Sequence, residues 1–134
     1  MRLVHTRYAK RGRTVLGFIP IVRHKTILTL EDAEEMLDVG FYHLRPHNGR
    51  KFKNTFVLVG SNSSVLADPN IEKSTCVYHG GDTHEHTTGC PLVGISFHFD
   101  GNTPNLDGCA EAMKILRSVL VGCGPHYATI LEDL

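Results

Sequence analysis

Short runs of apolar and β-branched residues, separated by turn residues, recur along most of this sequence and limit the folds that it can adopt. The runs cover residues 3–8, 14–22, 25–29, 40–44, 55–60 and 92–99. In the last run Ile95, Phe97 and Phe99 alternate with polar residues, which is the period of a half-buried strand. Residues 61–74 are polar and lack periodicity, which predicts a surface loop. The sequence therefore predicts a mainly antiparallel sheet whose first two strands form a hairpin.

Two segments instead have the pattern of a helix. Residues 30–37 combine good helix formers with acids in the first turn, a cap at Thr29 and a glycine at Gly40. Residues 107–121 place apolar side chains on one face and charged side chains on the other, and glycine follows. We therefore expect an α+β fold in which the sheet curves into a barrel or sandwich, with a short helix near 30–37 and a packed C-terminal helix near 107–121.

Length and composition bound the organisation of the chain. Its 134 residues, 41% of them hydrophobic, suffice for a single core, so we expect one domain over 1–134. The formal net charge is zero, which predicts no attraction to nucleic acid through bulk charge. No stretch approaches the roughly 20 apolar residues of a membrane span, and the first residues lack the apolar core of a signal peptide. We expect a protein that is cytoplasmic on synthesis and has no membrane span.

The four cysteines are too far apart for a zinc ribbon or a C-x-x-C redox motif. They are Cys76, Cys90, Cys109 and Cys123. Without a secretion signal we expect reduced thiols. Cys76 lies in a strand-like run and Cys109 on a helix face, so both are expected to be small buried residues. Only Cys90 has neighbours that indicate chemistry.

Residues 79–94 concentrate three histidines, two carboxylates and one thiol between glycines. A cysteine acyl-transfer site needs an unhindered thiol, a base and free backbone amides. Here Cys90 would be the nucleophile, His79 the base, and amides around Gly89 the oxyanion donors. His86 or Asp82 would orient His79 or protonate the leaving amine.

The same segment also suggests metal chemistry. His79, His84, His86 and Cys90, with Asp82, offer the nitrogen, sulfur and oxygen ligands of a tetrahedral zinc site. No H-E-x-x-H or other established zinc-binding spacing is present. We therefore expect no cofactor for the acyl-transfer enzyme, and zinc would bind only in the alternative metal site. A third interpretation is an ordinary polar loop that ends in a tight turn and a buried small residue.

The motif His79-Gly80-Gly81 through Thr87-Thr88-Gly89-Cys90-Pro91-Leu92-Val93-Gly94 resembles the signature of a family of uncharacterised phage and prophage proteins, H-x-G-N-x-x-x-D-T-x-G-C-x-x-x-G. The similarity extends to 29–32, 40–42 and 51–53 and so covers most of the chain. Asp82 replaces the Asn of the pattern and His86 replaces its Asp. The resemblance implies a phage setting for this chain.

A weaker resemblance links the spacing of His79 and Cys90 to L,D-transpeptidases, β-rich cell-wall enzymes with a histidine upstream of S-H-G-C. The gap is shorter here, and Thr87-Thr88 replaces Ser-His. This resemblance implies a cysteine-dependent acyl-transfer enzyme acting on peptidoglycan peptide, by transpeptidation or hydrolysis, with the virion or the cell wall as a later destination. The alternatives are a non-enzymatic phage protein that binds a host or phage protein, and a zinc-dependent hydrolase using 79–90. The oligomeric state stays open.

Overall fold

The computed structural model describes residues 1–49, 52–60, 76–87, 89–122 and 124–134. Seven strands form one sheet: β1 (Arg2–Arg11), β2 (Thr14–Ile19), β3 (Ile27–Asp32), β4 (Gly40–His47), β5 (Thr55–Gly60), β6 (Leu92–Gly94) and β9 (His126–Glu132). Their order is β5-β4-β9-β1-β2-β3-β6, and the pairing is antiparallel except between β1 and β9. The curled sheet forms a half-barrel, so the predicted α+β fold with a curved, mainly antiparallel sheet is confirmed.

The two edge strands of this sheet, β5 and β6, are joined through one short segment, residues 76–79. On one side Val77 pairs with Val57 of β5, and on the other His79 pairs with Leu92 of β6. Main-chain hydrogen bonds support both pairings, because Leu58 donates to Cys76 at 2.8 Å and Val93 donates to His79 at 2.9 Å. Segment 76–79, called the closing segment below, therefore links the two edges of the curled sheet.

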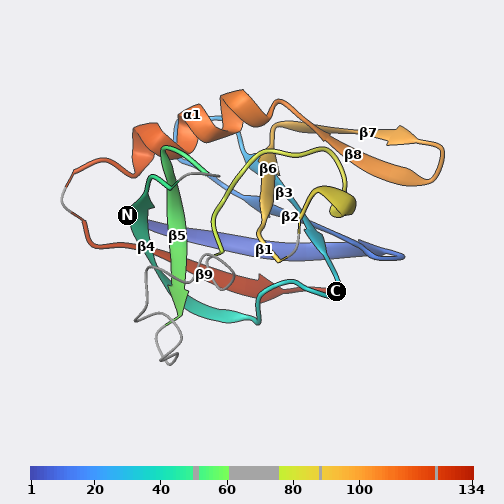
Figure 1. Cartoon of the computed structure of the whole chain (residues 1–134), viewed down its shortest axis with the longest axis horizontal. Coiled ribbons are helices and arrows are strands. Elements are labelled where there is room, and N and C mark those ends of the chain that lie inside the picture. The colour runs from blue at the N-terminus through green and yellow to red at the C-terminus, as the bar shows by residue number, and fades with distance from the viewer. Residues whose placement is uncertain (50–51, 61–75, 88, 123) are drawn as a thin grey trace.

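The described residues contain one α-helix, α1 (Cys109–Val119), within the range 107–121 predicted from the sequence. Ala112, Ile115 and Leu116 are its buried residues. They join an apolar core that includes Leu3 of β1 and Val93 of β6. Figure 1 shows α1 lying along one end of the curled sheet. Burial of each large aliphatic side chain contributes about 1.5–3 kcal/mol, so this contact holds the helix in place.

The expected helix near 30–37 does not form. Residues 30–32 complete strand β3, and a turn follows at 33–35. The acids that suggested a helix N-terminus are counter-ions of basic residues on neighbouring strands: Glu31 pairs with Arg7 and Asp32 with Arg13. Sheet pairing and these ion pairs outweigh the local helix propensity.

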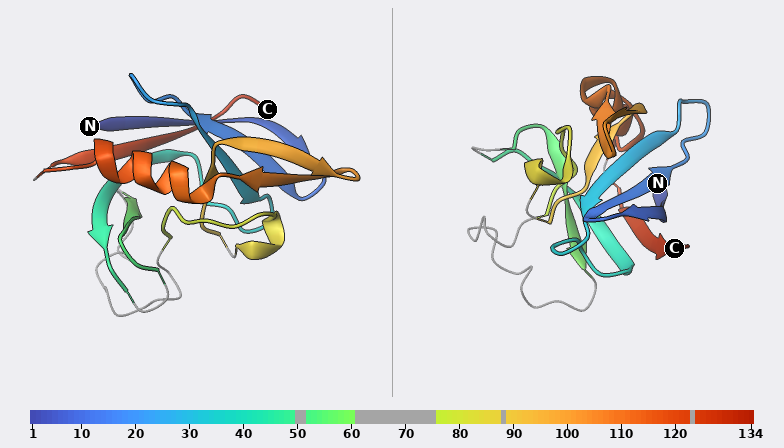
Figure 2. Two further views of the ribbon diagram at one scale, coloured as in Figure 1. Left: turned by 90° about the horizontal axis from the view of Figure 1, so that it is seen from above. Right: turned by 90° about the vertical axis from the view of Figure 1, so that its right-hand side faces the viewer.

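The predicted strand 92–99 is divided in two. Strand β6 ends at Gly94, and β7 (Ser96–Asp100) pairs with β8 (Thr103–Asp107) as a separate hairpin. Figure 2 shows this hairpin projecting beyond the sheet. The predicted loop at 61–74 lies outside the described residues. No helix in the described part of the chain is long and apolar enough to cross a membrane.

Candidate active site

The closing segment places His79 next to the strand that follows Cys90. The amide of His79 donates to the carbonyl of Pro91 at 3.3 Å, and the amide of Val93 donates to the carbonyl of His79 at 2.9 Å. The described residues between 80 and 90 consequently belong to a loop whose two ends lie side by side. Eleven positions separate His79 from Cys90 along the chain, but the fold brings His79 close enough to help lower the pKa of the Cys90 thiol.

The motif glycines lie where a side chain would collide with a neighbour. A Cβ at Gly80 would lie 2.9 Å from Cβ of Cys109 on α1, and a Cβ at Gly81 would lie 2.9 Å from a methyl of Leu92. Gly89 has φ of +121°, and a Cβ there would lie 2.8 Å from the carbonyl oxygen of Glu35. These glycines allow the loop to pack against α1, β6 and the turn after β3, which fixes the position of Cys90.

His79 has a defined orientation. Its Nδ1 donates a hydrogen bond to the carbonyl oxygen of Gly80 at 2.8 Å, because a carbonyl can only accept. The ring of Phe52 packs over the imidazole with 4.5 Å between ring centroids and 30° between planes. With Nδ1 engaged, Nε2 is the nitrogen available to the thiol of Cys90.

Cys90 is almost fully enclosed, with 7% of its surface exposed. The amide of Val77 donates to its sulfur at 3.4 Å. The hydroxyl of Thr87 donates to the Cys90 carbonyl at 2.5 Å and anchors the backbone from the other side. The sulfur thus faces hydrogen-bond donors of the closing segment.

These donors favour the thiolate form of Cys90. The hydrogen bond from the Cys76 thiol is the largest cause that lowers the pKa of Cys90. Burial opposes the change, but the hydrogen bond and charge of His79 and the amide of Val77 lower this pKa further. An anionic sulfur at neutral pH is the reactive form of a cysteine nucleophile.

This lowered pKa makes a prediction for alkylation. We expect the rate of Cys90 labelling by iodoacetamide to be nearly constant from about pH 6 to 8, whereas an ordinary thiol gains about tenfold per pH unit below its pKa near 8.5. The measurement is mass-spectrometric labelling of Cys90 against pH, with Cys90→Ser reporting the background from the other thiols. A tenfold rise per pH unit at Cys90 would show that its thiol is ordinary.

The other predicted site residues have separate places in the loop. His86 Nδ1 accepts hydrogen bonds from the amides of Asp82 and Thr83, at 2.9 and 3.3 Å, so this ring closes the turn η3 (His84–His86). The Asp82 carbonyl accepts from the amide of Leu106 on β8 at 2.8 Å. These contacts assign His86 and Asp82 parts in shaping the loop, and His79 Nδ1 bonds the carbonyl of Gly80 instead.

The same contacts bear on the zinc alternative. His84 Nδ1 shares a hydrogen bond of 3.1 Å with the hydroxyl of Thr14 on β2, away from the ring contacts of His79. Three rings of the proposed ligand set therefore engage three different partners. No group of three His, Cys, Asp or Glu side chains suited to a metal lies among the described residues.

Comparison with protein-family models, curated proteins and solved structures gives no match. The resemblances of the motif therefore remain predictions, and the geometry of the site carries the functional argument.

Two residues at the site could not be identified from a sequence motif. Phe52 belongs to the segment 51–53 that shared the family resemblance, yet its contact with the His79 ring follows only from the fold. Cys76, expected to be a small buried residue, is partly exposed and hydrogen-bonds Cys90. Both reach the site because the closing segment and β5 lie beside the loop.

A buried polar network lies behind the closing segment. Arg7 forms a two-bond ion pair with Glu31, at 3.0 and 2.8 Å, and both side chains are 1% exposed. His5 Nε2 lies 3.1 Å from the Glu31 carboxylate, and His5 Nδ1 lies 3.4 Å from the hydroxyl of Tyr78. Since Tyr78 directly precedes His79, this network fixes the closing segment to β1 and β3.

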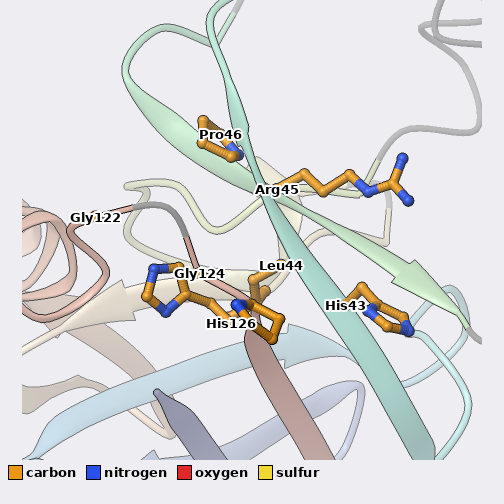
Figure 3. A pocket seen from close by; sticks show the side chains of 8 residues that line it. His43, Leu44, Arg45, Pro46, Gly122, Gly124 and His126 are labelled. Atoms are coloured by element: carbon orange, nitrogen blue, oxygen red, sulfur yellow. The ribbon is translucent and has the colours of Figure 1, made fainter.

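Two surface hollows lie apart from His79 and Cys90. One, of about 390 Å³, is lined by His43, Leu44, Arg45, Pro46, Gly122, Gly124, Pro125 and His126. In Figure 3 the Arg45 side chain extends away from the His126 ring. The other, of about 460 Å³, lies between Arg11 at the end of β1 and Asn102 between β7 and β8. Their lining residues do not include the Cys90 pair, so we assign them no part in its chemistry.

Proposed function

We propose that this protein is a cysteine-dependent acyl-transfer enzyme that acts on cell-wall peptide. One observation carries the proposal: His79, whose Nδ1 is held by the carbonyl of Gly80, lies close enough to Cys90 to help lower the pKa of its thiol. A nucleophile beside an oriented base is the arrangement that activates thiols for attack on carbonyls. The hydrogen bond from Val77 to the sulfur adds to the stability of the thiolate.

In the proposed reaction His79 holds the proton that the Cys90 thiol has lost, and the thiolate attacks an amide carbonyl of a peptidoglycan stem peptide. Backbone amides beside Gly89 and Cys90 stabilise the oxyanion, and protonated His79 returns the proton to the leaving amine. The resulting thioester passes its acyl group to a second amine, which is transpeptidation, or to water, which is hydrolysis. The choice of peptidoglycan rests on the resemblance to L,D-transpeptidases and to phage proteins.

The experiment is incubation of the protein with isolated peptidoglycan and with synthetic stem peptides, with and without an added amine, followed by mass spectrometry of the products. We expect Cys90→Ala to lower turnover by roughly 10³-fold or more while the protein stays folded, because the nucleophile is lost. An acyl-enzyme adduct on Cys90 in the wild type would identify the covalent step directly.

Cys109→Ser is the matched control. Cys109 is also a partly buried thiol near the loop, with its sulfur 3.5 Å from the carbonyl of Gly81, and serine keeps a donor there. We expect this variant to retain turnover. If Cys90→Ala acts on peptidoglycan as fast as the wild type, the acyl-transfer proposal fails. It also fails if the wild type shows no turnover and Cys90→Ala keeps all of its other properties. A non-enzymatic binding role then replaces it.

A further inference from the structure

The thiols of Cys76 and Cys90 are in contact, although fourteen positions separate them along the chain. Cys76 directly precedes Val77, whose amide donates to the Cys90 sulfur at 3.4 Å. A Cβ placed on Gly89 would lie 3.9 Å from the Cys76 sulfur. Each of the two thiols is the largest cause of the pKa shift of the other.

The backbone on both sides of this contact is well anchored. The carbonyl of Cys76 accepts from the amide of Leu58 on β5 at 2.8 Å. The carbonyl of Cys90 accepts from the hydroxyl of Thr87. The closure of the sheet therefore holds the backbone of both cysteines and keeps the two residues close together.

The two sulfurs differ chemically. Cys90 has a lowered pKa, as described above, whereas the hydrogen bond to Cys90, then burial, then the charges of Cys90 and Glu31 raise the pKa of Cys76. These opposite directions favour a thiolate on Cys90 and a protonated thiol on Cys76. A thiolate next to a protonated thiol is the arrangement of a nucleophilic cysteine and its resolving partner.

We propose that Cys76 and Cys90 form a redox-active dithiol, which reduces a hydroperoxide and becomes an intramolecular disulfide. In the first step the Cys90 sulfur attacks one oxygen of hydrogen peroxide. A sulfur–oxygen bond forms, the oxygen–oxygen bond breaks, and the departing hydroxide takes a proton from solvent to give water. Sulfur is oxidised to the sulfenic acid and the peroxide is reduced.

In the second step the Cys76 sulfur attacks the Cys90 sulfur. The disulfide forms, the sulfur–oxygen bond breaks, and hydroxide leaves with the Cys76 proton as a second water molecule. Oxidation of Cys90 removes its negative charge, which is among the causes that raise the pKa of Cys76. Loss of the proton from Cys76 therefore becomes easier at the stage when it must attack.

Hydrogen peroxide is a suitable oxidant because it is small and 7% of the surface of Cys90 is exposed. The chemistry does not require acyl transfer. Where Cys90 also performs acyl transfer, the disulfide removes its nucleophile until a thiol reductant restores it.

The test is stoichiometric hydrogen peroxide on fully reduced protein, followed by non-reducing peptide mapping. We expect a disulfide between the peptides containing residues 76 and 90, a mass loss of two hydrogen atoms, and recovery with dithiothreitol. Cys90 should be oxidised roughly tenfold faster than Cys109, because the thiolate is the reacting form. In Cys76→Ser we expect Cys90 sulfenic acid, trapped by dimedone, in place of the disulfide.

Several outcomes would overturn the inference: no reaction of Cys90, sulfinic acid on Cys90 of the wild type without the cross-link, or a disulfide that joins other cysteines. Cys109→Ser should form the same cross-link as the wild type. The readout is covalent and needs no substrate, so its failure is separate from failure of the proposed function. A protein that forms the disulfide but leaves peptidoglycan unchanged would refute only the acyl-transfer proposal.

Discussion

Glu31→Gln is expected to lower the free energy of unfolding by about 3–5 kcal/mol, because it leaves the buried charge of Arg7 without its main counter-ion. Arg7 and Glu31 are each 1% exposed, and two hydrogen bonds join them. The remaining contacts of the Arg7 guanidinium, to the carbonyl of Leu37 and to Glu132, cannot replace the lost carboxylate charge, since Glu132 is itself 40% exposed. Urea unfolding at neutral pH measures the change.

The dependence of the free energy of unfolding on pH in the acid range gives a second test of Glu31→Gln. Burial alone would raise the pKa of Glu31, but the hydrogen bonds and charges of His5 and Arg7 outweigh it and lower this pKa from 4.5 to about 2. The unfolded state then binds the proton more readily, so the contribution of Glu31 is complete above about pH 4.5 and is lost as the pH falls towards 2. Glu31→Gln should flatten this part of the curve.

Glu111→Gln is the matched control, because Glu111 is 49% exposed and pairs with Lys25 on the surface. Exposed ion pairs contribute about 0–1 kcal/mol. Equal losses in the two variants would mean that the Arg7–Glu31 pair is no more important than a surface pair.

Gly89→Ala is expected to destabilise the protein by roughly 2–5 kcal/mol, because backbone strain and a steric clash act together. Its φ of +121° disfavours any residue with a side chain, and the new methyl would lie 2.8 Å from the carbonyl oxygen of Glu35. Relief of this clash is expected to shift the backbone beside Cys90. We therefore also expect slower alkylation of Cys90, measured with thermal unfolding on the same samples.

Gly101→Ala separates strain from steric clash. Gly101 also has positive φ, +64°, but nothing lies within 4 Å of the position of a Cβ. We expect a cost of about 1–2 kcal/mol and unchanged labelling of Cys90. If Gly89→Ala is as stable as Gly101→Ala and labels as fast as the wild type, the packing of Gly89 against Glu35 does not hold the site.

The fold was predictable from the sequence where alternating apolar and polar residues, bounded by turn residues, marked the strands. Strands β1, β2 and β5 and helix α1 all have a local pattern that tertiary contacts reinforce. Residues 30–37 were misjudged because acids suit a helix N-terminus and a strand facing basic residues equally well, and only the position of Arg7 and Arg13 decides between them. Strand β9 was not foreseen, since its parallel pairing with β1 joins opposite ends of the chain.

The site was predictable to a different extent. The spacing of His79 and Cys90 pointed to a pair, and in the structure His79 is among the groups that lower the pKa of the Cys90 thiol. Their catalytic role stays a prediction. Cys76 could not be linked to Cys90 from spacing, because their contact arises when β5 and β6 are joined by residues between them. His5 and Glu31 likewise acquire their partners only when β1 and β3 lie in one sheet.

Because of the closing segment, the environment of the Cys90 thiol depends on the shape of the entire sheet. Its sulfur meets donors from residues 76–79, and these residues are held on one side by β5 and on the other by β6. In a chain whose sheet has formed but whose two edges have not yet met, Cys90 has neither His79 nor Val77 beside it and behaves as an ordinary thiol. The lowered pKa of Cys90 therefore depends on the closing segment lying between β5 and β6, and the alkylation rate of Cys90 reports whether that closure is intact.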